Sequence, residues 1–159
     1  MPDASEPFAI ATHQLRKCFD HFVALEGLSL QVPHACIFGL LGPNGAGKST
    51  AIKMLTTLLD PTSGSATVAG FDIARQPVEV RRHIGYVPQM LSADGALTAI
   101  ENLNLSARLQ GLRGAERRAR VKEALAFAGL EATASKLVRA YSGGMIRRLE
   151  IAQATLHNP

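Results

Sequence analysis

Tryptophan is absent from this 159-residue chain, and aromatic residues make up only 5% of it. Surfaces that bind nucleic acids commonly interleave aromatic and basic side chains, so no nucleic acid is expected as a partner. Cysteine is scarce too: Cys18 and Cys36 lack metal-ligand spacing and are too few for a disulfide framework. The longest near-apolar run, residues 35–41, is far shorter than the roughly 20 residues that span a bilayer, which argues against a membrane-spanning helix.

The residues that are present suffice for a packed core, because 47% of them are hydrophobic and only 19% are charged. The length suits one domain of ordinary size or part of a larger one. Cys36 lies in the apolar run and is expected to be a small buried hydrophobic residue. Unpaired thiols are typical of the reducing cytosol, which is the compartment expected here.

The net charge of +4 is concentrated in one segment, since residues 108–123 hold six basic and two acidic residues and the rest of the chain is neutral. We interpret this segment as the solvated face of a helix. Contact with a membrane surface or a partner protein is the alternative.

The first part of the chain has the pattern of β-structure. Apolar and polar residues alternate over 28–32, which predicts a half-buried strand. Residues 36–41 are continuously apolar, as in a strand covered on both faces. Two further short strands are predicted over residues 66–69 and 84–87.

Helices are predicted from their apolar stripes and end signals. A helix over residues 51–59 should bury Ala51, Met54, Leu55 and Leu58 and end at the Asp60-Pro61 pair. A capping box at Thr98 and Glu101 should start another helix.

Two more helices complete the second half of the chain. One has its apolar stripe over 121–128 and should end at Gly129. The last should start at Ser142, with its stripe at Met145, Leu149, Ala152 and Leu156. Residues 91–140 are therefore predicted to be all-helical.

A phosphate-binding loop is the strongest chemical signal. The pattern G-x-x-x-x-G-K-[ST] would arise by chance in a chain of this length with a probability of roughly 0.5%, and the predicted strand before it and helix after it are the context that it requires. Its residues, which we call the phosphate loop, are Gly42, Pro43, Asn44, Gly45, Ala46, Gly47, Lys48, Ser49 and Thr50.

The residue types in the phosphate loop suit a nucleoside triphosphate. Gly45 and Gly47 lack a Cβ, so the backbone can curl and direct successive N–H groups toward an anion at a helix N-terminus. Lys48 adds a full positive charge for the β- and γ-phosphates. The Ser49 hydroxyl is a hard oxygen ligand suited to Mg²⁺. The loop predicts nucleotide binding and leaves the use of the nucleotide open.

A second glycine-rich turn, residues 141–145, precedes the last predicted helix. Ser142 can cap that helix, and Gly143 and Gly144 bare the backbone N–H groups, so this turn is another candidate anion site. Taken alone, an ordinary helix cap explains it equally well.

In this order, the phosphate loop, the helical segment and the Ser-Gly-Gly turn resemble the nucleotide-binding domain of ATP-binding cassette (ABC) transporters. The resemblance extends from about Leu15 to Pro159. Residues 141–145 fall at that family's signature motif, and the form Y-S-G-G-M followed by basic residues resembles the drug-exporter branch typified by daunorubicin-resistance ATPases.

The resemblance implies an α/β fold of the P-loop NTPase type. It would have an N-terminal antiparallel β part, a phosphate-loop strand–helix core and a helical insert, with an incomplete central sheet. The implied domains are residues 1–90 for the β part and ATP-binding core, 91–141 for a helical subdomain and 142–159 for the signature helix. The chain is expected to stop before the Walker B strand and its catalytic carboxylate, so we expect negligible hydrolysis by these residues alone.

Two more residues acquire roles from the resemblance. Gln89 matches the family's Q-loop glutamine, which implies contact with Mg²⁺ and sensing of the γ-phosphate, so Lys48 and Gln89 are the candidate catalytic residues and Ser49 and Gln89 the candidate metal ligands. Phe19 falls where the family stacks the adenine ring.

The expected function is that of an ATP-binding subunit of an ABC exporter, with ATP and Mg²⁺ as cofactors. The resemblance implies two partners, which are a second nucleotide-binding domain in a head-to-tail dimer and a transmembrane permease subunit. It also implies a cytoplasmic, peripheral location at the inner face of the cell membrane. The alternatives are a soluble ABC-type ATPase without a membrane subunit and a small P-loop kinase whose arginines at 117, 118 and 120 form a lid.

Overall fold

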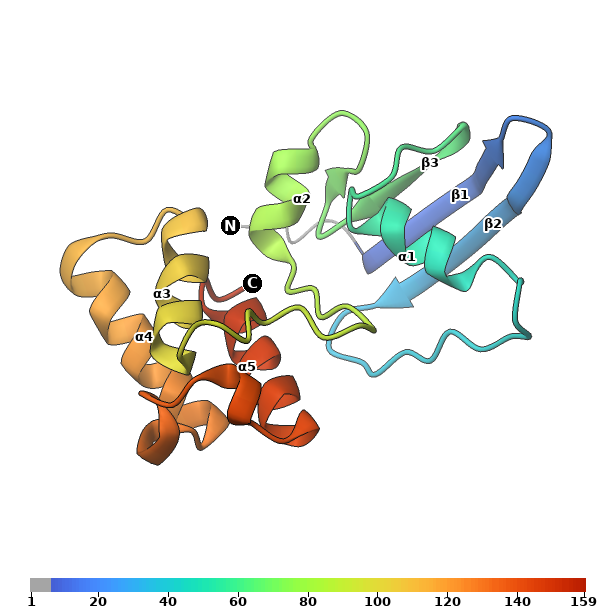
Figure 1. The fold of residues 1–159 in the computed structure, drawn as a ribbon. Helices are drawn as coiled ribbons and strands as arrows, with labels where there is room; N and C mark the ends of the chain where they lie inside the picture. The colour runs from blue at the N-terminus through green and yellow to red at the C-terminus, as the bar shows by residue number, and fades with distance from the viewer. Residues whose placement is uncertain (1–6) are drawn as a thin grey trace. The chain divides into compact units, whose positions relative to one another are not determined.

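The computed structural model describes residues 7–159, and the chain divides into two compact units (Figure 1). The first unit ends at Ile84 and the second comprises Gly85–Pro159. Each of the two clusters of buried apolar residues lies within one unit, so each unit is described by itself.

A four-stranded antiparallel sheet forms the first unit, with strand order β2-β1-β3-β4. The alternation over 28–32 is confirmed, because Ser29 and Gln31 are exposed while Val32 is buried. The predicted strand at 66–69 is also present and begins earlier than expected. The strands are β1 (Phe8–Phe19), β2 (Phe22–Pro33), β3 (Ser63–Val68) and β4 (Phe71–Asp72).

Two helices, α1 (Lys48–Leu55) and α2 (Pro77–His83), complete the first unit. Ala51 and Met54 of α1 are buried as predicted, and Met54 joins Leu15 and Val80 in the core. The prediction for Leu58 is wrong, because its side chain is 59% exposed.

The helix α1 ends before Leu58, and the reason lies in its C-terminal turn. Thr57 has a positive φ of 58°, and the N–H groups of Thr57 and Leu58 donate to the carbonyls of Met54 and Lys53. These two hydrogen bonds form a Schellman motif, which closes the helix without a glycine and ahead of Asp60.

The apolar segment 36–41 does not form the strand predicted for it. The exposed fractions of Ile37 and Leu41 are 105% and 91%, and Cys36 is exposed rather than buried. A strand covered on both faces needs neighbouring strands, and no strand within residues 7–159 pairs with this segment. The strand predicted over 84–87 is absent for the same reason.

The second unit is helical, which confirms the all-helical prediction for 91–140. Its core contains Leu103, Leu125, Val138 and Leu149, so three of its elements and the signature helix share one cluster. The elements are α3 (Ala99–Leu109), α4 (Gly114–Ala128), α5 (Gly143–Thr155) and two short 3₁₀ turns, η1 (Glu131–Thr133) and η2 (Val138–Ala140).

The predicted helix ends of the second unit are confirmed. Thr98 and Glu101 form both halves of the capping box at the start of α3. Gly129 has a φ of 62° and ends α4, and the Ser142 side chain accepts from the N–H of Met145 at the start of α5. The predicted stripe on α5 is present: Leu149, Ala152 and Leu156 are buried, and Met145 is partly buried against the same cluster.

Hydrogen bonds from Thr98 lower the pKa of Glu101 below its ordinary value. Because the pKa is depressed in the folded state, the stabilisation is present above the unfolded-state pKa and is lost as pH falls through the folded-state value. We predict that Glu101→Gln destabilises the second unit at pH 7 and that the difference from the parent chain disappears in acid. Thr98→Ala should cost about 1 kcal/mol at neutral pH.

Urea denaturation at a series of pH values measures both effects. Glu116→Gln is the matched control, because Glu116 stands in the first turn of α4, where no side chain caps the helix. An identical pH profile for the two Gln variants would contradict the assignment to the capping box.

Candidate nucleotide-binding site

The phosphate loop leads directly into α1. Residues 42–46 form an exposed turn, Gly47 is the N-cap residue, and Lys48, Ser49 and Thr50 are the first three residues of the helix. The Lys48 side chain folds back over the turn, and its ammonium donates to the carbonyls of Gly42 and Pro43, both at 2.7 Å. Lys48 thereby ties the end of the loop to its beginning and holds a positive charge over it.

The backbone amides of the phosphate loop are largely without acceptors. Ala46 donates to the Pro43 carbonyl at 3.3 Å, and α1 makes its first hydrogen bond from Ala51 to Gly47 at 2.8 Å. No side chain caps α1. Within residues 7–159, no acceptor is found for the N–H groups at positions 45 and 47–50. A cluster of unfilled donors beside an ammonium is a site for an anion with several oxygens.

Gly47 sets how closely the loop approaches the sheet. Its φ is 80°, and a Cβ on it would lie 2.5 Å from the Ala24 carbonyl oxygen and 2.9 Å from Leu25 Cδ1. The start of α1 therefore packs directly against β2. This contact fixes the direction in which the N–H groups of the phosphate loop point. Gly45 also has a positive φ, 86°, but faces open space.

Phe19 lies in the same unit, at the end of β1, and pairs with Phe22 across the hairpin. Ala24, which abuts Gly47, is two residues along β2 from Phe22, about 7 Å at the usual strand rise. The Phe19 ring is 45% exposed, and the Lys17 ammonium lies 5.0 Å from its centroid. An exposed aromatic face thus stands on the strand pair that supports the phosphate loop.

Ser49 suits a role as a metal ligand. Its residue is exposed on the first turn of α1, and its hydroxyl makes no hydrogen bond to any of the residues 7–159. Across the same residues, no three His, Cys, Asp or Glu side chains gather in a way that could hold a metal ion. One hydroxyl together with phosphate oxygens and water is a common environment for Mg²⁺.

The signature turn, residues 141–145, lies in the second unit. Ser142, Gly143 and Gly144 are exposed, and a Cβ on either glycine would meet nothing within 4 Å. Tyr141 attaches the turn to the core of the second unit. Its side chain is buried, and its hydroxyl donates to the Thr133 carbonyl at 2.7 Å.

Gln89 also lies in the second unit, in an exposed bend rather than at the end of a strand. The Arg147 guanidinium of α5 donates to the carbonyls of Pro88 at 2.7 Å and Gln89 at 3.0 Å. Further along, the buried Glu150 carboxylate accepts from the backbone N–H and the hydroxyl of Ser92. The backbone around Gln89 is thus attached to the helix that follows the signature turn.

The predicted site residues therefore fall into two groups. The phosphate loop and Phe19 belong to the first unit, whereas Gln89 and the turn at Ser142–Gly144 belong to the second. Sequence reasoning did not identify Glu150, although its i, i+3 spacing from Arg147 is a signal for an ion pair on a helix.

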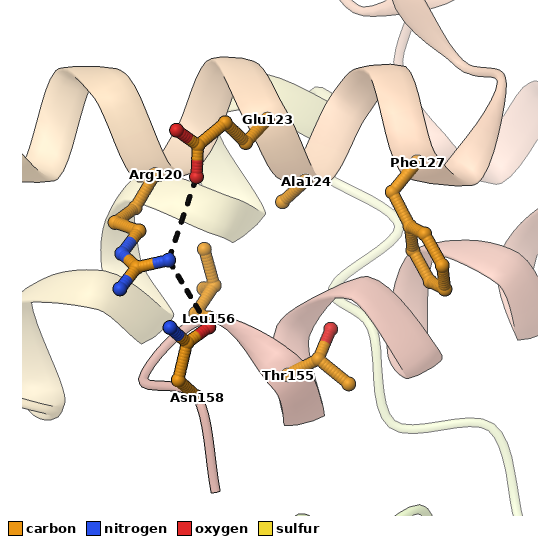
Figure 2. Close-up of a pocket in the computed structure, with 7 residues that line it drawn as sticks. All are labelled: Arg120, Glu123, Ala124, Phe127, Thr155, Leu156 and Asn158. Carbon is orange, nitrogen blue, oxygen red and sulfur yellow. Dashed lines mark hydrogen bonds and ion pairs between the residues drawn. The ribbon is translucent and has the colours of Figure 1, made fainter.

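A hollow of about 260 Å³ on the second unit is separate from all these residues (Figure 2). Its Arg120 donates to Asn158 at 3.0 Å and lies 3.5 Å from a Glu123 carboxylate oxygen, so this arginine is already occupied and gives no support to a phosphate-clamping lid. The lining residues are Arg120, Glu123, Ala124, Phe127, Thr155, Leu156 and Asn158.

In the part of the chain from Pro7 onward, none of the helices has both the length and the apolar character that crossing a bilayer requires.

Comparisons with known proteins agree with this geometry. Residues 25–159 match the family profile described as ABC transporter. The chain is 46% identical over 151 residues to the daunorubicin/doxorubicin resistance ATP-binding protein DrrA of Streptomyces peucetius, covering 95% of this chain and 46% of that protein. It is 44% identical over 146 residues to the Nod factor export ATP-binding protein I of Burkholderia thailandensis, covering 92% and 48%.

A solved structure of an ATP-binding subunit of an ABC transporter superposes with a TM-score of 0.81 at 31% identity, covering 95% of this chain and 63% of that one. The predicted fold class is thereby confirmed. The chain spans about half the length of the curated relatives that it matches.

Gly47 and Gly45 both have a positive φ, but only Gly47 lies against neighbouring atoms. Gly47→Ala adds a Cβ that meets a backbone carbonyl, so we expect a loss of about 2 kcal/mol or more in the free energy of unfolding. Gly45→Ala carries only the cost of a positive φ, about 1 kcal/mol. Urea denaturation of the two variants measures the difference. Equal losses would show that the approach to Ala24 does not constrain the loop.

Proposed function

Because the chain belongs to the ABC transporter family, we propose that it is part of an ATP-binding subunit that couples the binding and hydrolysis of Mg-ATP to export through a separate membrane subunit. The observation that carries this proposal is the phosphate loop. Its amides at positions 45 and 47–50 have no acceptor within residues 7–159, and the Lys48 ammonium stands over them.

Each residue of the first unit has a distinct task in this proposal. The amides and the helix N-terminus bind the phosphate oxygens, and one N–H of the Lys48 ammonium remains for a phosphate beyond its two carbonyl bonds. The exposed ring of Phe19 stacks on the adenine. Mg²⁺ supplies charge neutralisation, and the Ser49 hydroxyl is the residue of this unit that would hold it.

Gln89 and the signature turn act from the second unit. Gln89 contributes a neutral side-chain oxygen toward the metal and the γ-phosphate. The glycines at 143 and 144 weaken the first turn of α5 by about 1 kcal/mol each relative to alanine, yet neither is required by any neighbouring atom of the described residues. Their bare backbone therefore suits a close approach from outside, such as the triphosphate bound by a second nucleotide-binding domain in a head-to-tail dimer.

The names of the relatives support an export role, since one is a resistance protein for daunorubicin and doxorubicin and another serves Nod factor export. In our proposal the permease is a separate transmembrane subunit, and the chain works on the cytoplasmic side as a peripheral protein. The division into a β part with the ATP-binding core (1–90), a helical subdomain (91–141) and the signature helix (142–159) is part of the same proposal.

Lys48 provides the direct test of nucleotide binding. We predict that Lys48→Ala weakens binding of Mg-ATP roughly ten- to hundredfold, because a charged hydrogen-bond donor is lost from the phosphate site. Lys53→Ala is the matched control, since Lys53 is an exposed lysine in the last turn of the same helix. Titration calorimetry measures both affinities. Tight binding by the parent chain that Lys48→Ala leaves unchanged would overturn the proposal.

Phe19 separates recognition of the base from recognition of the phosphates. We predict that Phe19→Ala weakens ATP binding roughly tenfold, in line with the usual contribution of stacking a base on an aromatic ring, and leaves binding of inorganic triphosphate unchanged. Phe22→Ala is the control, because Phe22 pairs with Phe19 across the hairpin and is 68% exposed. Equal losses for both ligands, or for both variants, would contradict adenine stacking on Phe19.

A further inference from the structure

We propose that Arg147 and Glu150 of α5 are positioning residues that hold the backbone around Gln89, so that the signature helix and the Gln89 bend move as one piece. This inference rests on the proposed function for its consequence, because Gln89 has a catalytic task only if the chain binds Mg-ATP. The attachment itself is a property of the second unit, and it can be tested without a nucleotide.

One face of α5 carries the whole attachment. Arg147, Glu150 and Ala154 stand at i, i+3 and i+7, which places them along one side of the helix. Each meets the segment 85–92: Arg147 at residues 88 and 89, Glu150 at Ser92, and the Ala154 carbonyl at Gly85. Gly85 thus lies beside the last turn of the helix, residues 88 and 89 lie beside Arg147 near its start, and Ser92 lies beside Glu150, one turn after Arg147.

Gly85 shows how close this approach is. A Cβ at Gly85 would lie 2.6 Å from the carbonyl oxygen of Ala154, nearer than atoms pack. The absence of a side chain at the start of the segment thus permits the contact that Arg147 and Glu150 continue.

Arg147 holds the two peptide units that flank the Cα of Gln89. Its Nη1 donates to the Pro88 carbonyl and its Nη2 to the Gln89 carbonyl, so the planar fork spans two consecutive carbonyls. A fork with fixed geometry restricts rotation about the backbone bonds of Gln89 in a way that a single hydrogen bond would not. The direction in which the Gln89 side chain leaves the backbone is fixed with it.

Glu150 holds both the arginine and the far end of the bend. Its side chain is 1% exposed, and one of its carboxylate oxygens lies 3.0 Å from Arg147 Nη1. The other oxygen accepts from the N–H and the hydroxyl of Ser92. A buried carboxylate is costly unless it is paired and hydrogen-bonded, so this pair of contacts explains why an acid is tolerated between Leu149 and Ile151.

Amide hydrogen exchange of the full chain tests the attachment. Arg147→Ala and Glu150→Gln should each speed exchange in the segment 88–93 roughly tenfold or more, measured at the Ser92 N–H, which donates to Glu150. The first variant removes two hydrogen bonds from a charged donor, and the second leaves Ser92 with a neutral acceptor in place of a charged one. Arg148→Ala is the matched control: Arg148 is the neighbouring arginine, and it donates to the Ala128 carbonyl at the end of α4 instead. Its variant should leave the segment 88–93 at the parent rate.

Arg147→Lys distinguishes loss of the attachment from a general loss of folding. It keeps the positive charge beside Glu150 and removes only the ability to bind two carbonyls at once. It should also speed exchange in 88–93. The proposal is overturned if exchange in that segment is unchanged in the Arg147 and Glu150 variants, or if Arg148→Ala speeds it equally.

Nucleotide titrations test the consequence for Gln89. Gln89→Ala should reduce the preference of the chain for Mg-ATP over Mg-ADP, and Arg147→Ala should reduce it in the same direction. Adding Arg147→Ala to Gln89→Ala should change the preference by less than twofold further, because residues that act through one group are not additive. Full additivity would overturn a positioning role.

The exchange experiment and the nucleotide titrations distinguish the proposed attachment from the proposed function. If the parent chain binds no nucleotide, the proposed function fails, and the exchange experiment still decides whether Arg147 and Glu150 hold the bend. If the chain binds Mg-ATP and the exchange rates do not respond, the attachment fails and the proposed function stands.

Discussion

The close approach of Gly47 to the Ala24 carbonyl is the constraint on which the phosphate loop depends. It allows α1 to begin directly beside β2 with no side chain between them and no cap on its first amides. Lys48 then reaches back to the carbonyls that open the loop, so that positive charge and unfilled donors occupy one small region. A triphosphate is the kind of ligand that uses both, since its oxygens need many donors at short range.

The second unit meets a different requirement, which is to hold an exposed bend in one conformation. Hydrogen bonds within the segment 88–92 do not do so; a helix more than fifty residues later provides the fork of Arg147 and the carboxylate of Glu150. The same helix begins at the signature turn, whose first residue, Tyr141, is fixed through its hydroxyl to Thr133. The bend is therefore attached to the helix that the turn begins.

The features that could be predicted from the sequence were mostly those formed by residues close together along the chain. The capping box of Thr98, the end of α4 at Gly129 and the cap at Ser142 are made within a few residues, and all three are confirmed. The loop sequence likewise located its own turn and helix. The strand over 36–41 depends on partners elsewhere, and apolar character alone did not supply them. The pairing of Glu150 with Arg147 lies within one helical turn, but its contact with Ser92 joins residues 58 positions apart and could not be predicted from a local pattern.

The separation of the two apolar cores has a consequence for how the chain melts. Leu15 and Met54 belong to one cluster and Leu103 and Leu149 to the other, with no buried residue shared. Cooperative unfolding arises from a common core, so the residues within each cluster are expected to lose their packing together. A substitution in one cluster therefore acts directly on the packing of the unit that contains it.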